Sequence, residues 1–237
     1  MLSSRWAFAR DMHSDKKLKL IDLSQPLYPD CPCGPSDPPL RSRLAVCHEK
    51  DGWQVEQLTL TSHTGSHVEA PLHKIPGAPS ISDFPLERFV GAAVVVDLRG
   101  CRPGQPFTSS MLARKLREQN DLSNHIILLA TGWGTKRGAV SGNEEPAPFL
   151  APDGADWLLE QEVRGVGMDC LSIGGFREPS NSLTHQKLLE ANIWILEDLR
   201  FPEEVFALPQ PVQFWALPIH LERASAAFCR PVIAVQT

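Results

Sequence analysis

Long apolar runs and basic runs are both missing from this sequence of 237 residues. No apolar stretch approaches the roughly 20 residues that a membrane-spanning helix needs, and no run of lysine or arginine is longer than two residues. The formal charge of −5 gives no basis for a nucleic-acid groove. We therefore expect a small-molecule substrate, with no membrane and no nucleic acid as partner.

Paired cysteines are also missing. The six cysteines are scattered without a CxxC pair, and a single proline separates Cys31 from Cys33, which is a poor arrangement for a zinc clamp. Near the N-terminus, Arg5, Arg10 and Asp11 interrupt any apolar run, so no secretory signal peptide is expected. These features predict a cytoplasmic protein with reduced thiols.

Two common catalytic motifs are absent as well. No GxSxG sequence is present, which argues against a serine hydrolase built on a nucleophile elbow. Glycine pairs occur at residues 132–134 and 165–167, but the later glycine of a dinucleotide-binding loop follows neither pair. Hydride transfer from a nicotinamide cofactor is therefore not expected.

The composition is otherwise that of a globular protein, with 42% hydrophobic and 22% charged residues and 21 prolines. Residues 1–17 show no clear period and are interpreted as an N-terminal extension. Residues 18–237 contain no repeat and no break in composition, so they are interpreted as one domain. Residues 24–39 are rich in proline and predict an irregular loop.

Hydrophobic periodicity predicts more strands than helices. Residues 54–60 alternate polar and apolar side chains, which favours a half-buried strand that leads straight into the histidine segment. The other expected strands cover residues 18–23, 92–98, 126–130, 166–170, 193–196 and 232–235. The expected helices cover residues 109–118, 153–160 and 182–190.

The segment HTGSHVEAPLH, residues 63–73, holds three of the eight histidines. His63, His67, Glu69 and His73 all occupy odd positions, so an extended chain would project them to one face. A helix fits worse, because Glu69 would lie about 240° around from His63 at 100° per residue and a proline would interrupt it. The pattern favours a one-sided polar site.

A straight strand cannot bring these groups to one point, because ten residues at about 3.3 Å each span roughly 33 Å. The segment must curl, and Gly65 and Pro71 are the positions where curling is easiest. Imidazole and carboxylate are ligands that Zn²⁺ or Mn²⁺ prefers. We interpret the segment as a metal site, the alternative being a polar strand end whose histidines lie at the surface or are hydrogen-bonded in the core.

A second group of residues follows about a hundred positions later. In residues 181–192, His185, Leu188, Leu189 and Asn192 recur with helical spacing, so His185 lies on the buried stripe. If the next strand folds back beside this helix, Glu197 ends at the level of His185. The alternative is a hydrogen-bonded core histidine and an ordinary charge at the end of a strand.

Together the two groups resemble the cyclase family of metal-dependent hydrolases, whose members include bacterial kynurenine formamidases and isatin hydrolase. The family's HxGTHxDxPxH motif is similar to residues 63–73, and its HxxLL…E element is similar to residues 185–197. Further similarity lies in residues 22–27, 131–133, 167–169 and 216–218. Two departures stand inside the first motif, because Ser66 replaces the usual Thr and Glu69 replaces the usual Asp.

The resemblance implies an α/β fold, a single compact domain of the swivelling β/β/α type. Its central mixed β-sheet is barrel-like and carries flanking helices. The resemblance also implies a homodimer and the hydrolysis of a C–N bond in a formamide or lactam beside an aromatic ring.

By the same resemblance, His63, His67 and Glu69 hold one divalent ion, Zn²⁺ or Mn²⁺. His73, His185 and Glu197 hold a second ion or act as acid and base.

Other functions stay open from the sequence. The same metal and base would open a lactone or ester, and a metal that only stabilises the strand end would make a binding protein without activity. Trp133, Lys136 and Arg177 are candidate substrate contacts, with packing or surface roles as the alternative for each.

Overall fold

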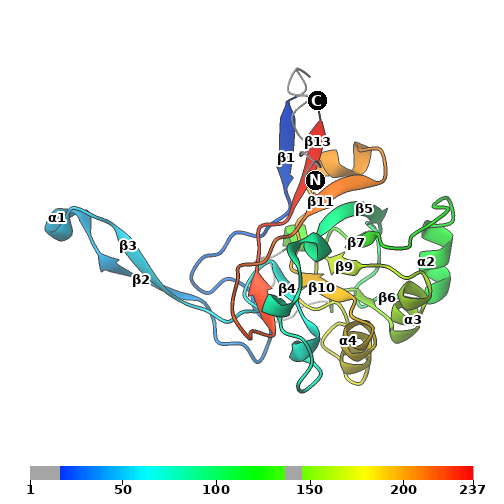
Figure 1. The fold of residues 1–237 in the computed structure, drawn as a ribbon, viewed down its shortest axis with the longest axis horizontal. Helices are drawn as coiled ribbons and strands as arrows, with labels where there is room; N and C mark the ends of the chain where they lie inside the picture. The colour runs from blue at the N-terminus through cyan, green and yellow to red at the C-terminus, as the bar shows by residue number, and fades with distance from the viewer. Residues whose placement is uncertain (1–16, 137–145, 237) are drawn as a thin grey trace, which may run out of the picture.

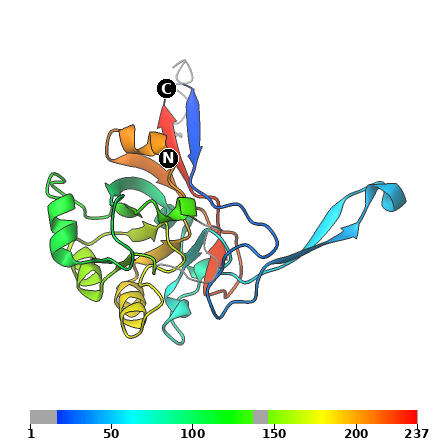
Figure 2. The same cartoon turned by 180° about the vertical axis from the view of Figure 1, so that it is seen from behind.

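A nine-stranded mixed sheet forms the centre of the computed structural model, which describes residues 17–136 and 146–236 (Figure 1). In spatial order its strands are β1 (Leu18–Asp22), β13 (Val232–Gln236), β11 (Val212–Trp215), β5 (Val90–Asp97), β7 (Ile126–Ala130), β9 (Gly165–Met168), β10 (Trp194–Glu197), β4 (His67–Glu69) and β12 (Ala226–Phe228). β5, β7, β9 and β10 run parallel to their neighbours in this group, and the flanking strands pair antiparallel. The sheet curls into a half-barrel (Figure 2).

Three helices cover one face of the parallel strands (Figure 1). They are α2 (Ser109–Lys115), α3 (Pro152–Glu160) and α4 (Ser180–Glu190). Short 3₁₀ turns connect the strands: η1 (Pro71–His73), η2 (Ile81–Asp83), η3 (Leu86–Phe89), η4 (Trp133–Lys136) and η5 (Glu203–Ala207). A small ribbon of β6 (Pro106–Phe107) and β8 (Phe149–Leu150) lies next to the helices. None of the helices that the structure describes is long and apolar enough to span a bilayer.

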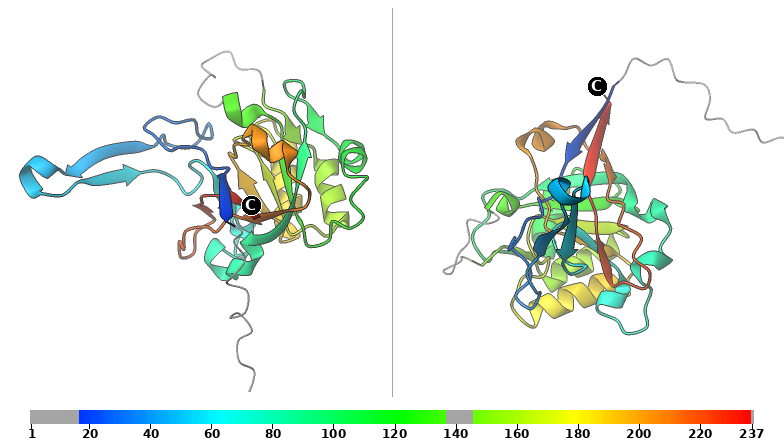
Figure 3. Two further views of the ribbon diagram at one scale, coloured as in Figure 1. Left: turned by 90° about the horizontal axis from the view of Figure 1, so that it is seen from above. Right: turned by 90° about the vertical axis from the view of Figure 1, so that its left-hand side faces the viewer.

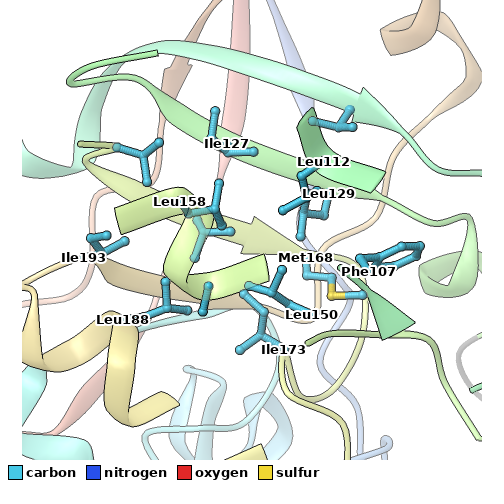
Figure 4. Packing of buried hydrophobic residues seen from close by; sticks show 14 of the residues in the cluster. Phe107, Leu112, Ile127, Leu129, Leu150, Leu158, Met168, Ile173, Leu188 and Ile193 are labelled. Carbon is cyan, nitrogen blue, oxygen red and sulfur yellow. The ribbon is translucent and has the colours of Figure 1, made fainter. Parts of the chain in front are cut away.

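Alternate residues of the central strands enter two separate cores. Ile127 and Leu129 of β7 pack with Leu112 and Leu158 beneath the helices (Figure 4). Leu128, between them, joins the core on the opposite face of the sheet. Because both faces of β7 are covered, all five of its residues are apolar, as is typical of a buried parallel strand.

Most predicted elements are confirmed in position, with ends that differ by a few residues. The mixed α/β class with its curled sheet is confirmed too. The irregular loop predicted at residues 24–39 contains only turns, bends and one isolated bridge. The proposed extension is not tested, because residues 1–16 lie outside the described ranges.

The predicted burial of residues 54–60 is wrong. β3 (Val55–Thr59) is exposed along its whole length, because it pairs only with β2 (Arg41–Val46) in a two-stranded ribbon. This ribbon, with α1 (His48–Asp51) at its tip, projects far from the body of the molecule (Figure 3). We call residues 41–59 the arm. Alternation shows that one face of a strand is apolar, but it does not show what covers that face.

Candidate metal centre

β4 brings the first two site residues together. His67 and Glu69 alternate along this three-residue strand, so both side chains lie on the same face. β10 pairs with β4 in a register that sets Glu197 opposite His67, and directly opposed residues of antiparallel strands have Cβ atoms about 5 Å apart. His67 Nε2 therefore lies 3.6 Å from Glu197 Oε2. The sheet register carries Glu197 into the site.

His63 and His73 reach the same centre from outside the strand. His63 lies in the turn before β4, where Gly65 has a φ of 72°, and His73 closes η1, which begins at Pro71. His63 Nδ1 is 3.1 Å and His73 Nε2 is 3.5 Å from Glu69 Oε1. The predicted curl at the glycine and the proline is confirmed.

α4 supplies the remaining histidine. His185 is buried with Leu188 and Leu189, as the helical spacing predicts. Its Nε2 atom lies 3.3 Å from Glu197 Oε1 and 3.6 Å from Glu69 Oε2. The predicted meeting of His185 with Glu197 is confirmed, so all six residues singled out in the sequence surround one centre.

Backbone groups hold the ligand atoms in place. His67 Nδ1 donates to the carbonyl of Gly65 at 2.8 Å, and His185 Nδ1 donates to the carbonyl of Asn181 at 2.8 Å. Each ring therefore presents its Nε2 atom to the centre, an arrangement common behind metal ligands. Glu197 Oε1 accepts a hydrogen bond from the backbone N–H of Ile173 at 2.7 Å. Sequence reasoning missed these contacts because backbone groups have no residue signature.

The six residues around this centre form what we call the cluster: His63, His67, Glu69, His73, His185 and Glu197. Their charges shift one another's pKa values. Burial would lower the pKa of His67, but contact with Glu69 and the charge of Glu197 outweigh it and raise that pKa to about 9. The pKa of His185 is raised to about 9 in the same way, against burial, by Glu197 and Glu69. Burial would raise the pKa of Glu69, yet the surrounding imidazoles hold it well below its usual value. Burial lowers the pKa of His73. The carboxylates of Glu69 and Glu197 therefore stabilise positive charge on His67 and His185.

The donor set fits a divalent cation. Two groups of three ligand atoms lie within 4.8 Å of one another, His63 with Glu69 and His73, and His67 with Glu69 and Glu197. Glu69 Oε2 is buried and has no hydrogen-bond partner among the described residues, and such a group normally has one. Imidazole and carboxylate ligands suit Zn²⁺ and Mn²⁺. Glu69 belongs to both groups.

The other candidates lie outside the cluster. Lys136 Nζ sits 3.8 Å from the centroid of the Trp133 ring, so a cation–π contact engages both side chains. Arg177 lines a cavity formed by neighbouring loops. Within the described residues, none of the three makes a hydrogen bond or ion pair with the cluster. Their role as substrate contacts stays a prediction.

A buried carboxylate organises the loop beside the site. Asp169 accepts hydrogen bonds from Thr131 N at 2.9 Å, from Thr131 Oγ1 at 2.6 Å and from Gly132 N at 2.8 Å. Two of the short stretches that resemble the family, residues 131–133 and 167–169, therefore meet at the ends of β7 and β9. The hydrogen bonds between Asp169 and residues 131–132 give a structural reason why both stretches resemble the family.

Comparison with known proteins finds relatives of similar sequence and structures of similar fold. A kynurenine formamidase of Bordetella avium is 29% identical over 226 residues, covering 91% of this chain and 97% of the relative. Isatin hydrolase A from Labrenzia aggregata, solved with benzyl benzoate, has the same fold, with a TM-score of 0.80 and 22% identity over 93% of this chain and 94% of its own. A structure described as a predicted metal-dependent hydrolase from Bacillus stearothermophilus has a TM-score of 0.72 and 24% identity over 92% and 98%.

The family comparison covers both β4 and the contact between Thr131 and Asp169. The match to the Cyclase family runs through residues 21–174, which is more than half of the chain. The resemblance seen in the two sequence motifs is thereby confirmed, and this chain belongs to the Cyclase family.

Proposed function

We propose that this protein is a metal-dependent hydrolase that cleaves an amide C–N bond in an aromatic small molecule. The observation that carries the proposal is the meeting of His67, Glu69 and Glu197 across β4 and β10, with three further histidines around the same carboxylates. The relatives named kynurenine formamidase and isatin hydrolase support an amide of an aromatic compound as the substrate.

The cluster offers enough ligands for one or two ions. We assign His63, His67 and Glu69 to one ion. We assign Glu197 and His185 to a second ion, which would bind at their end of the cluster. Zn²⁺ and Mn²⁺ both suit these ligands. A divalent ion held there supplies Lewis acidity, which polarises a carbonyl and lowers the pKa of water from 15.7 to about 7.

The residues of the chain then handle the protons. His73 is the most exposed imidazole of the cluster, with 34% of its side chain accessible, so it can meet a substrate more readily than the others. We assign to His73 the transfer of a proton from the attacking water to the departing nitrogen. Glu69, 3.5 Å from His73 Nε2, holds the ring in position. His185 and Glu197 form the other candidate acid–base pair.

The decisive variant is His67→Ala, which removes a ligand whose side chain is almost fully buried. We expect bound metal and activity to be lost together. Elemental analysis of untreated protein gives the metal's identity and stoichiometry, and turnover of an aryl formamide, isatin and a lactone panel before and after chelation gives the reaction. His125→Ala is the control, because His125 precedes β7 at the amino ends of the parallel strands, whereas Glu197 lies at their carboxyl ends.

The outcomes separate the remaining functions. Full metal content and full activity in His67→Ala would show that the site is wrongly assigned. Turnover of the lactones alone would indicate an ester-type hydrolase. Metal-dependent stability with no turnover of any compound would indicate a binding protein.

We also propose a homodimer in which the arm packs against a second copy. Leu44 and Leu58 are each 53% exposed and share one face of the ribbon, and Trp53 at its tip is 74% exposed. A lone two-stranded hairpin is marginal in water, and exposed apolar patches mark interaction surfaces. Replacing both leucines by serine should convert a dimer into a monomer in sedimentation, while Leu86→Ser, which removes an equally exposed leucine outside the arm, should not. A wild-type monomer would contradict the proposal.

The cytoplasmic location inferred from the cysteine pattern stays a prediction. Cell fractionation with an antibody against the protein would test it.

A further inference from the structure

A cavity of about 130 Å³ lies at the loop whose Ile173 N–H hydrogen-bonds Glu197 of the cluster. The loop that follows β9, residues 172–177, forms one wall, and Phe149 of β8 and the loop at Gly104 form the others. The parallel strands β9 and β10 end at this edge of the sheet, where ligands commonly bind in open α/β sheets. Ile173, from the same loop, packs beneath the helices (Figure 4). It belongs to the same core as Ile195, which shares a strand face with Glu197. The cavity therefore lies on the face that carries the cluster.

The loop that lines the cavity contacts Glu197 directly and is connected to His185 through Asn181. Ser172 and Gly174 line the cavity, and Ile173 between them donates its N–H to Glu197 Oε1 at 2.7 Å. Ser172 Oγ hydrogen-bonds Asn181 Oδ1 at 2.9 Å, and the carbonyl of Asn181 accepts from His185 Nδ1. A molecule in the cavity would thus lie one residue away from the group that orients Glu197.

The size and the lining match an aromatic ring with an anionic substituent. A cavity of roughly 150 Å³ holds one benzene molecule. Phe149 and Phe176 supply aromatic walls, and Phe176 is 49% exposed, which is unusual for so large an apolar side chain. Arg177 also lines the cavity and makes no ion pair within the described residues. Its planar guanidinium group suits a carboxylate, which it can bind through two parallel hydrogen bonds.

We propose that this cavity holds the aromatic ring of the substrate and that Arg177 binds a carboxylate on that ring. The inference rests on the proposed function and narrows the substrate to an N-acyl aromatic amine that carries an acid group. The amide end of such a molecule extends toward the cluster. Hydrolysis of 2-formamidobenzoate, a member of this class, consumes one water, breaks the C–N bond and yields formate and 2-aminobenzoate.

The test compares 2-formamidobenzoate with formanilide, which has the same ring and formamide but no carboxylate. We expect Arg177→Gln to raise the KM for 2-formamidobenzoate about tenfold or more, because a charged hydrogen-bonded pair is lost. The KM for formanilide should stay unchanged. Arg177→Lys should recover part of the loss, and Arg117→Gln, an exposed arginine elsewhere, should behave as wild type.

A second measurement does not depend on activity. Binding of 2-aminobenzoate to the chelated protein, followed by calorimetry, should weaken about tenfold in Arg177→Gln and stay unchanged in Arg117→Gln. Ala147→Phe, which fills the cavity from its rim, should weaken binding of both the acid and aniline.

The failure of this proposal can be told apart from that of the proposed function. If the wild type hydrolyses neither formamide nor isatin, the proposed function fails, and the binding measurement alone decides on the cavity. If both formamides are hydrolysed and Arg177→Gln affects them equally, the cavity assignment is overturned. Binding of 2-aminobenzoate that ignores Arg177 overturns it as well.

Discussion

At the scale of single residues, Glu69 is the centre of the site. One of its oxygens lies 3.1 Å from His63 and 3.5 Å from both His67 and His73, and the other lies 3.6 Å from His185. No other side chain of the cluster reaches four of the remaining members. The family usually has aspartate here, so the longer glutamate extends the reach of the carboxylate by one bond.

Glu69→Asp tests what this extra length does. The carboxylate would retract by about 1.5 Å, the length of one C–C bond. It would keep its distance to the histidines on one side of the cluster and move away from those on the other side. We expect the variant to retain metal but to change the ratio of kcat/KM among aryl formamide, isatin and lactone substrates. Elemental analysis and parallel kinetics would measure both. Complete loss of metal would show instead that the geometry requires glutamate.

The sequence predicted which residues meet, but not what orients them. Alternation along residues 63–73 and the helical spacing around His185 are local patterns, so they could be recognised without a structure. Ser225, whose Oγ lies 3.4 Å from His63 Nε2, could not be recognised, because it joins the site through the pairing of β12 with β4. A lone serine far along the chain gives no signal of such pairing.

At the scale of elements, the turn before β4 depends on one glycine. Gly65 has a φ of 72°, its carbonyl orients His67, and a Cβ atom there would lie 2.4 Å from Leu27 Cδ2. Leu27 is a half-exposed side chain that can move. The main effects of a larger residue are therefore backbone strain and a displaced turn.

Gly65→Ala should lower the free energy of unfolding by about 1 kcal/mol, the cost of a left-handed alanine, and should also weaken metal binding. Gly77→Ala is the matched control, because its φ is 75° and nothing lies within 4 Å of the added Cβ atom. The control should lose similar stability and keep its metal affinity. Thermal unfolding and metal titration measure the two effects. Equal metal affinity in both variants would show that this turn does not set the ligand geometry.

The strands that the sequence did not predict are short, and the strand whose burial was predicted wrongly does not pack against the rest of the molecule. β12 has only three residues, too few for a period to be recognised. β3 was placed correctly, but its exposure follows from the arm's distance from the body, which is a property of the whole fold. The longer elements β5, β7 and α4 were predictable because each repeats its pattern over five or more residues.

At the scale of the whole molecule, the cluster contributes to stability only when its charges are balanced. His67, Glu69 and Glu197 are each less than 5% exposed, and buried charges are costly without partners. A ligand present at a thousand times its Kd adds about 4 kcal/mol to stability. For a chain of this length we expect chelation to lower the Tm by on the order of 10 °C.

Differential scanning calorimetry with and without chelator measures this shift. Restoring the metal should restore the Tm, and His67→Ala should show no shift on chelation because it holds no ion. An unchanged Tm in the chelated wild type would mean that the ion does not stabilise the fold.

The position of β4 in the sheet also determines when the site can form during synthesis. Its neighbours are residues 195–197 and 226–228, and both follow it by more than 120 residues. A nascent polypeptide still attached to the ribosome therefore carries the first histidines long before it contains the strands that align them. We therefore expect the cluster to assemble, and to be able to bind a divalent ion, only after residues 226–228 have been synthesised.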